Sequence, residues 1–572
     1  MGDRNGELAT LANIGLVYRN SNQPNKAITY LEDSLNILLS LRGELQKDFR
    51  ESFLQINRGP AVALVDLLID QNQPQQAFEW ANRVTTYELA DYNRLIGVQV
   101  ANPEIQAALD DWNEQLQQVQ ALRQQLPDNT SETLVDQIRD LEAQLFQQAE
   151  TLANNYPEIA ELFEIEPEDL NQLQASIPPG TVILQPVLLT DIQNVPDTIA
   201  LFLLSRDSLS VKKVPIEAEQ FRTWVSDYYN ILQSQDIGYR RIGGHLYDHL
   251  IRPIEEDIAA LNPQQLGIIA TGDLRRFPFE TLWDSQEETF LLEHYPIHYL
   301  TRLSRHSLLA EPRPQSLPRL PLLPLSLGLG GLGLGLMLKS RPWGGAFLAA
   351  AVVTGGLSQM FTPRYAVLGF ANPKPEAPYD LPGTEVEVQT IAELAPDSQV
   401  FFQEAANLET FKRQSPHYRY LHLATHGCFQ ELGCCLQGDC QDFQQREIHL
   451  EPNTLLFADG NYPLADAALL GLEDTELVAL SACQTALETT RDRDAIAGMA
   501  YVWERAGARS VMATLWTVED AATERLMSEF YRLVIEEGLT KAEALRESKL
   551  RERQENAHPF FWSPLLLIGD PR

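Results

Sequence analysis

Residues 419–486 of this 572-residue chain hold two short apolar segments that end in reactive side chains. The first reads Tyr420-Leu421-His422-Leu423-Ala424-Thr425-His426-Gly427, and the second reads Leu477-Val478-Ala479-Leu480-Ser481-Ala482-Cys483-Gln484-Thr485. Short apolar runs of this kind are typical of strands that are buried on both faces of a sheet. Because open α/β sheets bind ligands at the carboxyl ends of their strands, the pattern predicts an imidazole and a thiol at one such edge.

A thiol and an imidazole placed together can cleave peptide bonds. A cysteine with its ordinary pKa of about 8.5 is mostly protonated at pH 7, so it needs a base to become a nucleophile. His426 can accept the proton of Cys483 and later return it to the leaving amine. Gly427 has no side chain to obstruct its N–H, which could form an oxyanion hole with the N–H of Cys483. These residues predict a cysteine-peptidase dyad.

Each of these residues also has a structural interpretation. A cysteine at a strand end more often packs against its neighbours than acts as a nucleophile. His422, inside the first segment, fits a core histidine better than a catalytic one. The pairing of the two segments, rather than either side chain alone, therefore carries the catalytic prediction.

Composition excludes several classes of function. The chain is 44% hydrophobic and long enough for two to four domains with their own cores. Its formal net charge of −35 argues against nucleic acid and against an anionic membrane surface as partners. The first fifteen residues lack the apolar core of a signal peptide. We therefore expect a reducing cytoplasm, in which Cys483 stays a free thiol.

Four of the five cysteines lie within thirteen residues directly after His426. They are Cys428, Cys434, Cys435 and Cys440. An odd total with an adjacent pair is a poor disulfide framework, and the spacing does not match paired zinc knuckles. The interpretations left open are an exposed variable loop, which we favour, a redox-sensitive loop beside the site, and a zinc site.

The first hundred residues predict helical repeats of the tetratricopeptide type. Small and large residues alternate over 8–41 as two closely packed antiparallel helices require. Asn22-Gln23-Pro24-x-x-Ala27 recurs as Asn72-Gln73-Pro74-x-x-Ala77, with a longer helix expected around Leu45–Leu54. The alternative is a generic helical hairpin. Residues 101–177 show helical periodicity without reactive residues and predict a structural spacer.

From residue 178 onward, strand-like and helix-like segments alternate, which predicts an α/β domain with a mostly parallel sheet flanked by helices. Strands are expected at 181–189, 198–204, 208–214, 266–273, 365–370, 400–402, 420–427, 449–456, 477–485 and 510–516. Helices are expected at 218–233, 244–261, 386–394, 407–412, 495–506, 520–537 and 540–555, with a turn and short helix at 463–470.

Residues 311–363 interrupt this alternation with proline, glycine and leucine. Two runs, 320–338 and 342–363, contain no acidic or basic residue, and each is about as long as a membrane-spanning helix. The first run includes a Leu-Gly stretch at 325–338. The glycines of the first run disfavour a helix by about 1 kcal/mol each in water. We leave two interpretations open, a membrane hairpin or re-entrant anchor and an apolar loop that binds a partner.

The two reactive segments resemble the CHAT domain of the caspase–separase clan of cysteine peptidases. His-Gly after one apolar segment and Ala-Cys after another is the signature of that clan. Further likeness lies in Ala506-Gly507-Ala508-Arg509-Ser510-Val511, in Leu515-Trp516, in Gly272-Asp273-Leu274-Arg275-Arg276-Phe277-Pro278-Phe279, in Trp562 and in Ile568-Gly569. The resemblance covers roughly 178–572, and such domains are typically found behind tetratricopeptide repeats, chiefly in bacteria.

This resemblance implies a caspase-like fold without a cofactor or metal, in which His426 is the general base and acid and Cys483 is the nucleophile. It divides the chain into repeats (1–100), a spacer (101–177), the first part of the CHAT domain (178–310), an insertion (311–363) and the catalytic part (364–572). Four acidic residues, each of which could equally be a helix cap or a solvated surface charge, follow the strands where the walls of a substrate pocket are expected. As pocket residues they would favour a basic residue before the cut. They are Asp492, Asp494, Glu519 and Asp520.

The sequence therefore predicts a cytoplasmic cysteine endopeptidase. The helical repeats are expected to bind a protein substrate or regulator, and no nucleic acid is expected. The alternative is a catalytically idle signalling scaffold that contacts a membrane through 311–363.

Overall fold

The computed structural model describes residues 4–43, 58–90, 169–304 and 366–572, together with isolated helical residues between 107 and 151. Inside these ranges it leaves out 193–194, 377, 430–433, 435–449, 452, 482–494 and 517–519. The helix expected around Leu45–Leu54, most of the spacer and the whole insertion 311–363 lie outside the described residues.

The amino-terminal region is helical, as predicted, and forms two hairpins. They are α1 (Arg4–Asn20) with α2 (Pro24–Gly43), and α4 (Arg58–Asp70) with α5 (Pro74–Ala90). The repeated Asn-Gln-Pro motif makes both turns. Asn22 and Asn72 have φ angles of 56° and 57°, a left-handed conformation that asparagine tolerates better than most residues. A proline then opens the second helix, where its missing N–H costs nothing.

Gly15 allows the first hairpin to close tightly. A Cβ atom at this position would lie 2.8 Å from Cγ of Leu31 in α2, so a larger residue would push the two helices apart. The small residue that the repeat pattern requires at this position therefore has a packing reason.

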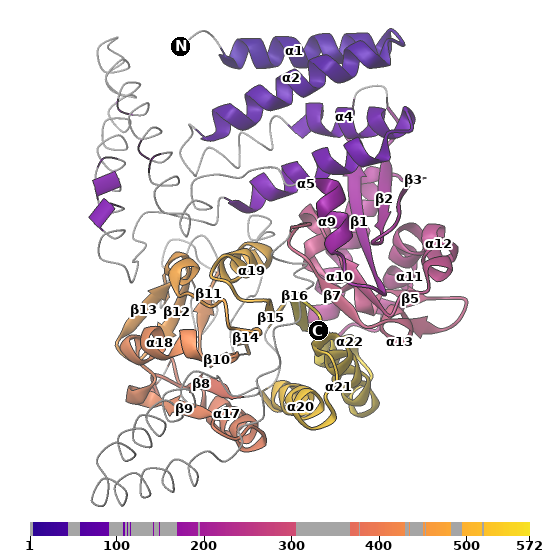
Figure 1. Ribbon diagram of the computed structural model, residues 1–572. Helices are drawn as coiled ribbons and strands as arrows, with labels where there is room; N and C mark the ends of the chain where they lie inside the picture. Colours follow the sequence, from indigo (N-terminus) through magenta and orange to yellow (C-terminus); the bar gives the residue numbers. More distant parts are fainter. Residues whose placement is uncertain are drawn as a thin grey trace, which may run out of the picture.

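One large sheet organises the rest of the described chain. It has 11 strands in the order β3-β2-β1-β4-β7-β16-β15-β14-β10-β8-β9 (Figure 1). The strands are β1 (Thr181–Leu189), β2 (Thr198–Leu204), β3 (Leu209–Pro215), β4 (Gln265–Ile268), β7 (Ile297–Tyr299), β8 (Val367–Ala371), β9 (Gln399–Phe402), β10 (Tyr420–Ala424), β14 (Leu477–Leu480), β15 (Ser510–Thr514) and β16 (Leu565–Gly569).

The sheet is mostly parallel, and this confirms the predicted fold class. β1, β4, β7 and β16 run in one direction, and β15, β14, β10, β8 and β9 run together in the other. The two groups meet where β15 pairs antiparallel with β16. The sequence pattern did not predict β16, because this carboxy-terminal strand pairs with neighbours that are distant along the chain.

Helices cover both faces of the sheet. One face packs against a group that includes α10 (Ala218–Gln233), α11 (Tyr239–Leu250), α18 (Leu408–Gln414), α19 (Ala495–Arg505) and α22 (Pro559–Trp562). The other face, over the second group of strands, packs against α17 (Pro382–Leu394), α20 (Asp520–Arg532) and α21 (Lys541–Glu555).

The helical hairpins complete the cover of this second face. Side chains from α2, α4, α5 and the short helix α9 (Leu170–Ser176) share one hydrophobic core with β1 and β2. Phe78 of α5 packs edge-on against Phe202 of β2, with 5.6 Å between the ring centroids. Figure 1 shows the hairpins stacked over β1 to β3. The hairpins and the sheet therefore form a single packed unit.

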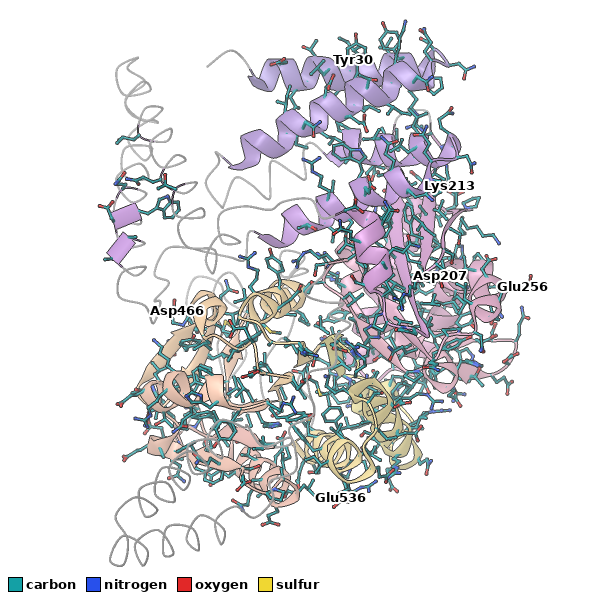
Figure 2. The ribbon with its side chains drawn as sticks, viewed as in Figure 1. Tyr30, Asp207, Lys213, Glu256, Asp466 and Glu536 are labelled. Atoms are coloured by element: carbon teal, nitrogen blue, oxygen red, sulfur yellow. A yellow bond between two sulfur atoms is a disulfide. The ribbon has the colours of Figure 1, made fainter. Side chains whose placement is uncertain are left out.

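A buried carboxylate ties the hairpins to the edge strand β3. Asp66 of α4 is fully buried, and Lys213 of β3 lies 2.6 Å from its Oδ1 atom. Arg19 of α1 binds its Oδ2 atom and also donates to the carbonyl oxygen of Ala63 at 3.1 Å. Figure 2 shows Lys213 where the hairpins meet the sheet.

A small second sheet lies beyond β10. It consists of β11 (Gly427–Cys428), β12 (Thr454–Phe457) and β13 (Gly460–Pro463), all antiparallel. The strand expected at 449–456 is thus shorter and begins later than predicted. The residues just before the expected turn at 463–470 form β13, and a 3-10 helix follows at Leu464–Leu469.

Candidate active site

The two reactive segments lie next to each other in the sheet. β10 and β14 pair in parallel, with Leu423 opposite Leu480. His426 follows the last residue of β10 by two positions, and Cys483 follows the last residue of β14 by three. Neighbouring parallel strands end at the same edge, so the chain leaves the sheet at one edge after both Ala424 and Leu480. Cys483 itself lies outside the described residues.

A main-chain carbonyl holds the ring of His426. Nε2 of His426 lies 3.1 Å from the carbonyl oxygen of Tyr379, which can only accept a hydrogen bond. Nε2 therefore carries the proton in the neutral ring, and Nδ1 keeps its lone pair. Among the described residues, Nδ1 is buried and has no hydrogen-bond partner. The nitrogen that is free to accept a proton is thus Nδ1.

The electrostatic environment keeps this imidazole neutral. His426 is only 5% exposed, and burial lowers its pKa to about 4, with the hydrogen bond to Tyr379 as a smaller opposing effect. A neutral imidazole can act as a base at pH 7, whereas an imidazolium cannot. Nδ1 thus keeps a free lone pair at pH 7, and the low pKa means that it takes a proton only when a negative charge such as a thiolate lies beside it.

The loop that carries Tyr379 is held by Asn372, directly after β8. The amide nitrogen of Asn372 donates to Oδ1 of Asp380 and to Oε1 of Glu385, each at 3.0 Å. Its amide oxygen accepts from the N–H of Leu381 at 2.9 Å. Asn372 is 2% exposed and has a φ angle of 42°. Its side chain thus fixes both sides of the turn that presents the Tyr379 carbonyl.

Gly427 presents a main-chain N–H that the neighbouring strand does not use. It lies opposite Leu455 in the antiparallel ladder of β11 and β12. In the preceding pair of the ladder, the N–H of Leu456 donates a hydrogen bond to the carbonyl oxygen of His426, at 2.8 Å. This places Gly427 at a non-hydrogen-bonded position, so its N–H points away from β12. The group can bind an oxyanion without breaking the ladder.

A disulfide follows Gly427 immediately, and it corrects the prediction from cysteine spacing. Cys428 is bonded to Cys434, and both are buried, with exposures of 0% and 2%. Main-chain hydrogen bonds join Cys434 to Leu450 in both directions. The expectation of free cysteines in an exposed loop is thus wrong for this pair, because their main chains are held close enough to bond. Cys435 and Cys440 lie outside the described residues.

The described residues do not test the predicted substrate pocket. Asp492, Asp494 and Glu519 lie outside the described residues, as Cys483 does. Asp520 is the first residue of α20, and the structure does not describe its side chain. Sequence reasoning missed Tyr379 and Asn372. The asparagine directly before a proline, after a buried strand, was the available signal for a structured turn.

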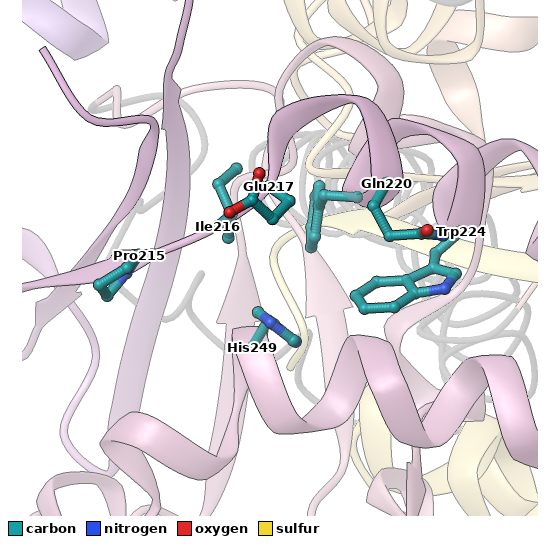
Figure 3. A pocket seen from close by; sticks show the side chains of 7 residues that line it. Pro215, Ile216, Glu217, Gln220, Trp224 and His249 are labelled. Atoms are coloured by element: carbon teal, nitrogen blue, oxygen red, sulfur yellow. The ribbon is translucent and has the colours of Figure 1, made fainter.

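A small pocket lies in the first half of the domain, away from β10 and β14. It has a volume of about 240 Å³ and lies between β3, α10 and α11 (Figure 3). Trp224 stacks on His245 beside it, with 4.7 Å between the ring centroids. It is lined by Pro215, Ile216, Glu217, Gln220, Phe221, Trp224 and His249.

The fold defines a class, an α/β protein with one large, mostly parallel sheet flanked by helices. A sequence model described as the CHAT domain matches residues 240–570, which is more than half of the chain. The chain belongs to the CHAT domain family. No curated protein matches it.

The chain also matches solved structures at low identity. Two crystal structures of the Saccharomyces cerevisiae separase–securin complex match with TM-scores of 0.37 and 0.36 at 10% identity, covering 95% and 98% of this chain. This chain spans only 40% and 46% of the matched separase chains. The Arg-specific cysteine proteinase gingipain R matches with a TM-score of 0.32 at 8% identity, over 62% of this chain and 75% of its own.

The described part of the chain holds neither a candidate membrane span nor a candidate metal site. None of the helices in the described part of the chain is long and apolar enough to cross a membrane. Within that same part, no cluster of three or more histidine, cysteine or acidic side chains could hold a metal ion.

Proposed function

We propose that this chain is a cysteine endopeptidase with Cys483 as the nucleophile and His426 as the general base. The observation that carries the proposal is the orientation of His426. Its Nε2 atom is occupied by the Tyr379 carbonyl, and its unprotonated Nδ1 atom lies at the sheet edge from which the segment of Cys483 also departs. The match to the CHAT family supports the same assignment.

The reaction proceeds in two halves. Nδ1 of His426 takes the thiol proton while Sγ of Cys483 attacks the peptide carbonyl carbon, and the C–N bond then breaks as Nδ1 returns the proton to the leaving amine. Water attacks the resulting thioester after giving a proton to Nδ1. That proton returns to sulfur as the carboxylic acid leaves, so the free thiol is restored.

Gly427 supplies the electrostatic part of the mechanism. Its N–H, which the ladder with β12 leaves unused, and the N–H of Cys483 stabilise the negative oxygen of the tetrahedral intermediate. Removing one such donor costs about 3–4 kcal/mol of transition-state stabilisation in other proteases.

The helical hairpins would bind the protein substrate or a regulator. Their shared core with β1 and β2 supports this role, because a partner held on the hairpins keeps a fixed position relative to the sheet. The acidic residues Asp492, Asp494, Glu519 and Asp520 would favour a basic residue before the cut.

Mapping of new protein N-termini across a cell tests activity and preference together. The full chain is compared with Cys483→Ala, and Cys440→Ala serves as a matched control because it also removes one thiol. We expect new N-termini, preceded by basic residues, with the wild type and Cys440→Ala and none with Cys483→Ala. Identical maps for all three proteins would contradict the proposal.

A second candidate function is a non-catalytic signalling scaffold. The burial of both His426 and Gly427 favours it, because a substrate carbonyl cannot reach them without a change in the surrounding chain. A peptidyl probe with a thiol-reactive group distinguishes the two functions. A scaffold would show the same labelling for the wild type and Cys483→Ala, whereas a peptidase would lose its label with the substitution.

Association with a membrane is a separate proposal that rests on the apolar composition of 311–363. Fractionation of the full chain beside a 311–363 deletion tests it. Equal recovery of both proteins in detergent-free buffer would reject an anchor, and would leave a cytoplasmic enzyme.

A further inference from the structure

A second histidine, His422, lies at the centre of a buried polar network below the proposed dyad. It is 0% exposed and sits in the middle of β10. Its Nε2 atom lies 3.0 Å from Oε1 of Glu387 and 3.2 Å from Oγ of Ser481. Its Nδ1 atom lies 3.3 Å from the hydroxyl of Tyr531. Glu387 and Ser481 are 4% and 6% exposed, so the network is closed to solvent.

The protons in this network can be assigned. A carboxylate only accepts, so Nε2–H of His422 donates to Glu387. Nδ1 then accepts from Tyr531, whose hydroxyl stays protonated because burial and, to a lesser extent, the nearby Glu387 charge raise its pKa well above the ordinary value. Ser481 shares the Nε2–H with Glu387. Every polar contact of His422 is therefore directional and satisfied.

The network joins four elements of the fold. Glu387 comes from α17, His422 from β10, Tyr531 from α20, and Ser481 directly follows β14. Along β10, Leu421 and Leu423 point into the core on the opposite face, so His422 faces α17 and α20. The contacts join the middle of β10 and the end of β14 to two helices.

Each part of the network adjoins a part of the proposed active site. His422 precedes His426 by four residues, and Ser481 precedes Cys483 by two. Glu387 belongs to α17, which begins three residues after Tyr379, whose carbonyl holds His426. A shift in this network would therefore move the base, its carbonyl partner and the nucleophile segment relative to one another.

Packing alone does not require polar groups at these positions. Apolar side chains of similar volume often replace a buried charged network without loss of stability. Hydrogen bonds are directional, whereas apolar contacts are not, so they fix distances and directions between the elements that they join. The contribution of this network to catalysis is thus geometric.

We propose that Glu387, His422 and Ser481 are positioning residues that set the distance between His426 and Cys483. The inference rests on the proposed peptidase function and deepens it. None of the three touches the substrate. Their effect passes through the strand ends that carry the dyad.

The test uses two variants that weaken the network, one control just before β14 and one rescue variant. Ser481→Ala removes a buried hydroxyl at the carboxyl end of β14, and Glu387→Gln removes the charge while keeping the shape. Thr475→Val removes a buried hydroxyl just before the other end of β14, where it donates to the carbonyl oxygen of Tyr418 at 3.1 Å. Ser481→Thr keeps the hydroxyl and serves as a rescue.

Two quantities are measured on the full chain. One is the rate at which iodoacetamide alkylates Cys483 at pH 7, followed by mass spectrometry of the peptide that contains it. The other is kcat and KM on a peptide cleaved by the wild type. We expect Ser481→Ala and Glu387→Gln to lower the alkylation rate and kcat by about 10- to 100-fold with little change in KM. Thr475→Val and Ser481→Thr should stay near the wild type.

The outcomes separate the positioning role from the proposed function. Unchanged alkylation and kcat in Ser481→Ala and Glu387→Gln, with only a lower unfolding temperature, would make the network purely structural. A wild-type Cys483 that reacts no faster than in His426→Gln, and cleaves nothing, would instead overturn the peptidase assignment and the positioning role with it.

Discussion

His426 donates a hydrogen bond from Nε2 to the main-chain carbonyl oxygen of Tyr379, although 47 residues separate them along the chain. The contact decides which ring nitrogen carries the proton and leaves Nδ1 as the base. Its acceptor is a main-chain atom, so the partner depends on the conformation of the 372–381 turn rather than on the tyrosine side chain. The residues that hold this turn therefore control the base.

Asn372→Asp should weaken both stability and activity. The substitution keeps the shape and the acceptor for Leu381 but replaces the amide donor with a third carboxylate beside Asp380 and Glu385. We expect a loss of about 1–3 kcal/mol in the free energy of unfolding at pH 7. The loss should be smaller near pH 4, where a protonated carboxyl can donate. Urea unfolding at the two pH values measures it.

Asn407→Asp is the matched control for this experiment. Asn407 caps α18 by accepting from the N–H of Thr410 at 2.9 Å, and aspartate caps a helix as well as asparagine does. This variant should keep the unfolding free energy and peptide cleavage of the wild type. An Asn372→Asp protein as stable and active as the control would show that the turn does not depend on the amide.

The lowered pKa of His426 should make the fold sensitive to acid. The folded pKa is about 4 and the ordinary value is 6.5, so the unfolded chain binds more protons between these values. The free energy of unfolding should therefore fall as the pH drops from about 6.5 to about 4, with no further loss from this group below that. The full effect is about 3 kcal/mol. Urea unfolding of the wild type and His426→Gln at pH 7, 5.5 and 4 measures the difference.

His298 offers an internal comparison for the acid effect. It is buried in β7, and burial lowers its pKa to about 4 as well. His298→Gln should remove a similar share of the pH dependence, and the double variant should remove both shares because the residues lie on separate strands. Parallel curves for the wild type and His426→Gln would show that the His426 pKa is not lowered.

Sequence patterns predicted the local elements of this fold well. The meander β1 to β3, the alternation of strands and helices, and both helical hairpins follow from residues that lie close together in the chain. β16 was missed because its place depends on partners in β7 and β15, and β13 because its hairpin partner β12 was misplaced. A local sequence pattern does not indicate which distant strands will pair.

The position of the candidate site in the sheet was predictable from the local motif. His426 and Gly427 lie at the sheet edge that the motif predicted, and the dyad with Cys483 stays a prediction. The partners of the two histidines were not predictable, since one is a main-chain carbonyl and Glu387 comes from a helix 35 residues upstream of His422. The disulfide was missed because cysteine spacing does not report the main-chain pairing that brings Cys434 to Cys428.

Loss of the Cys428–Cys434 bond should destabilise the segment after Gly427. Closing a loop of this length stabilises the fold by about 2 kcal/mol in the chain-entropy model. Addition of dithiothreitol should lower the unfolding free energy of the wild type by that amount and slow peptide cleavage. Cys434→Ser should show both losses without reductant and no further change with it. A reductant effect that persists in Cys434→Ser would trace to another thiol.

Asp66→Asn should loosen the helical hairpins from the sheet. The buried carboxylate faces Lys213 of β3 and Arg19 of α1, and removing its charge takes the buried anion away from both cations and leaves Lys213 with the more exposed Asp70. Loss of one partner of a buried pair costs about 3–5 kcal/mol.

Asp70 provides the control. It also binds Lys213, at 2.7 Å, but its side chain is 49% exposed, and an ion pair at such a site contributes about 0–1 kcal/mol. Asp66→Asn should therefore unfold at lower urea concentration and release the hairpins to limited proteolysis, while Asp70→Asn should behave as the wild type. Equal behaviour of the two variants would mean that the apolar core shared with β1 and β2 holds the hairpins without help from this charge.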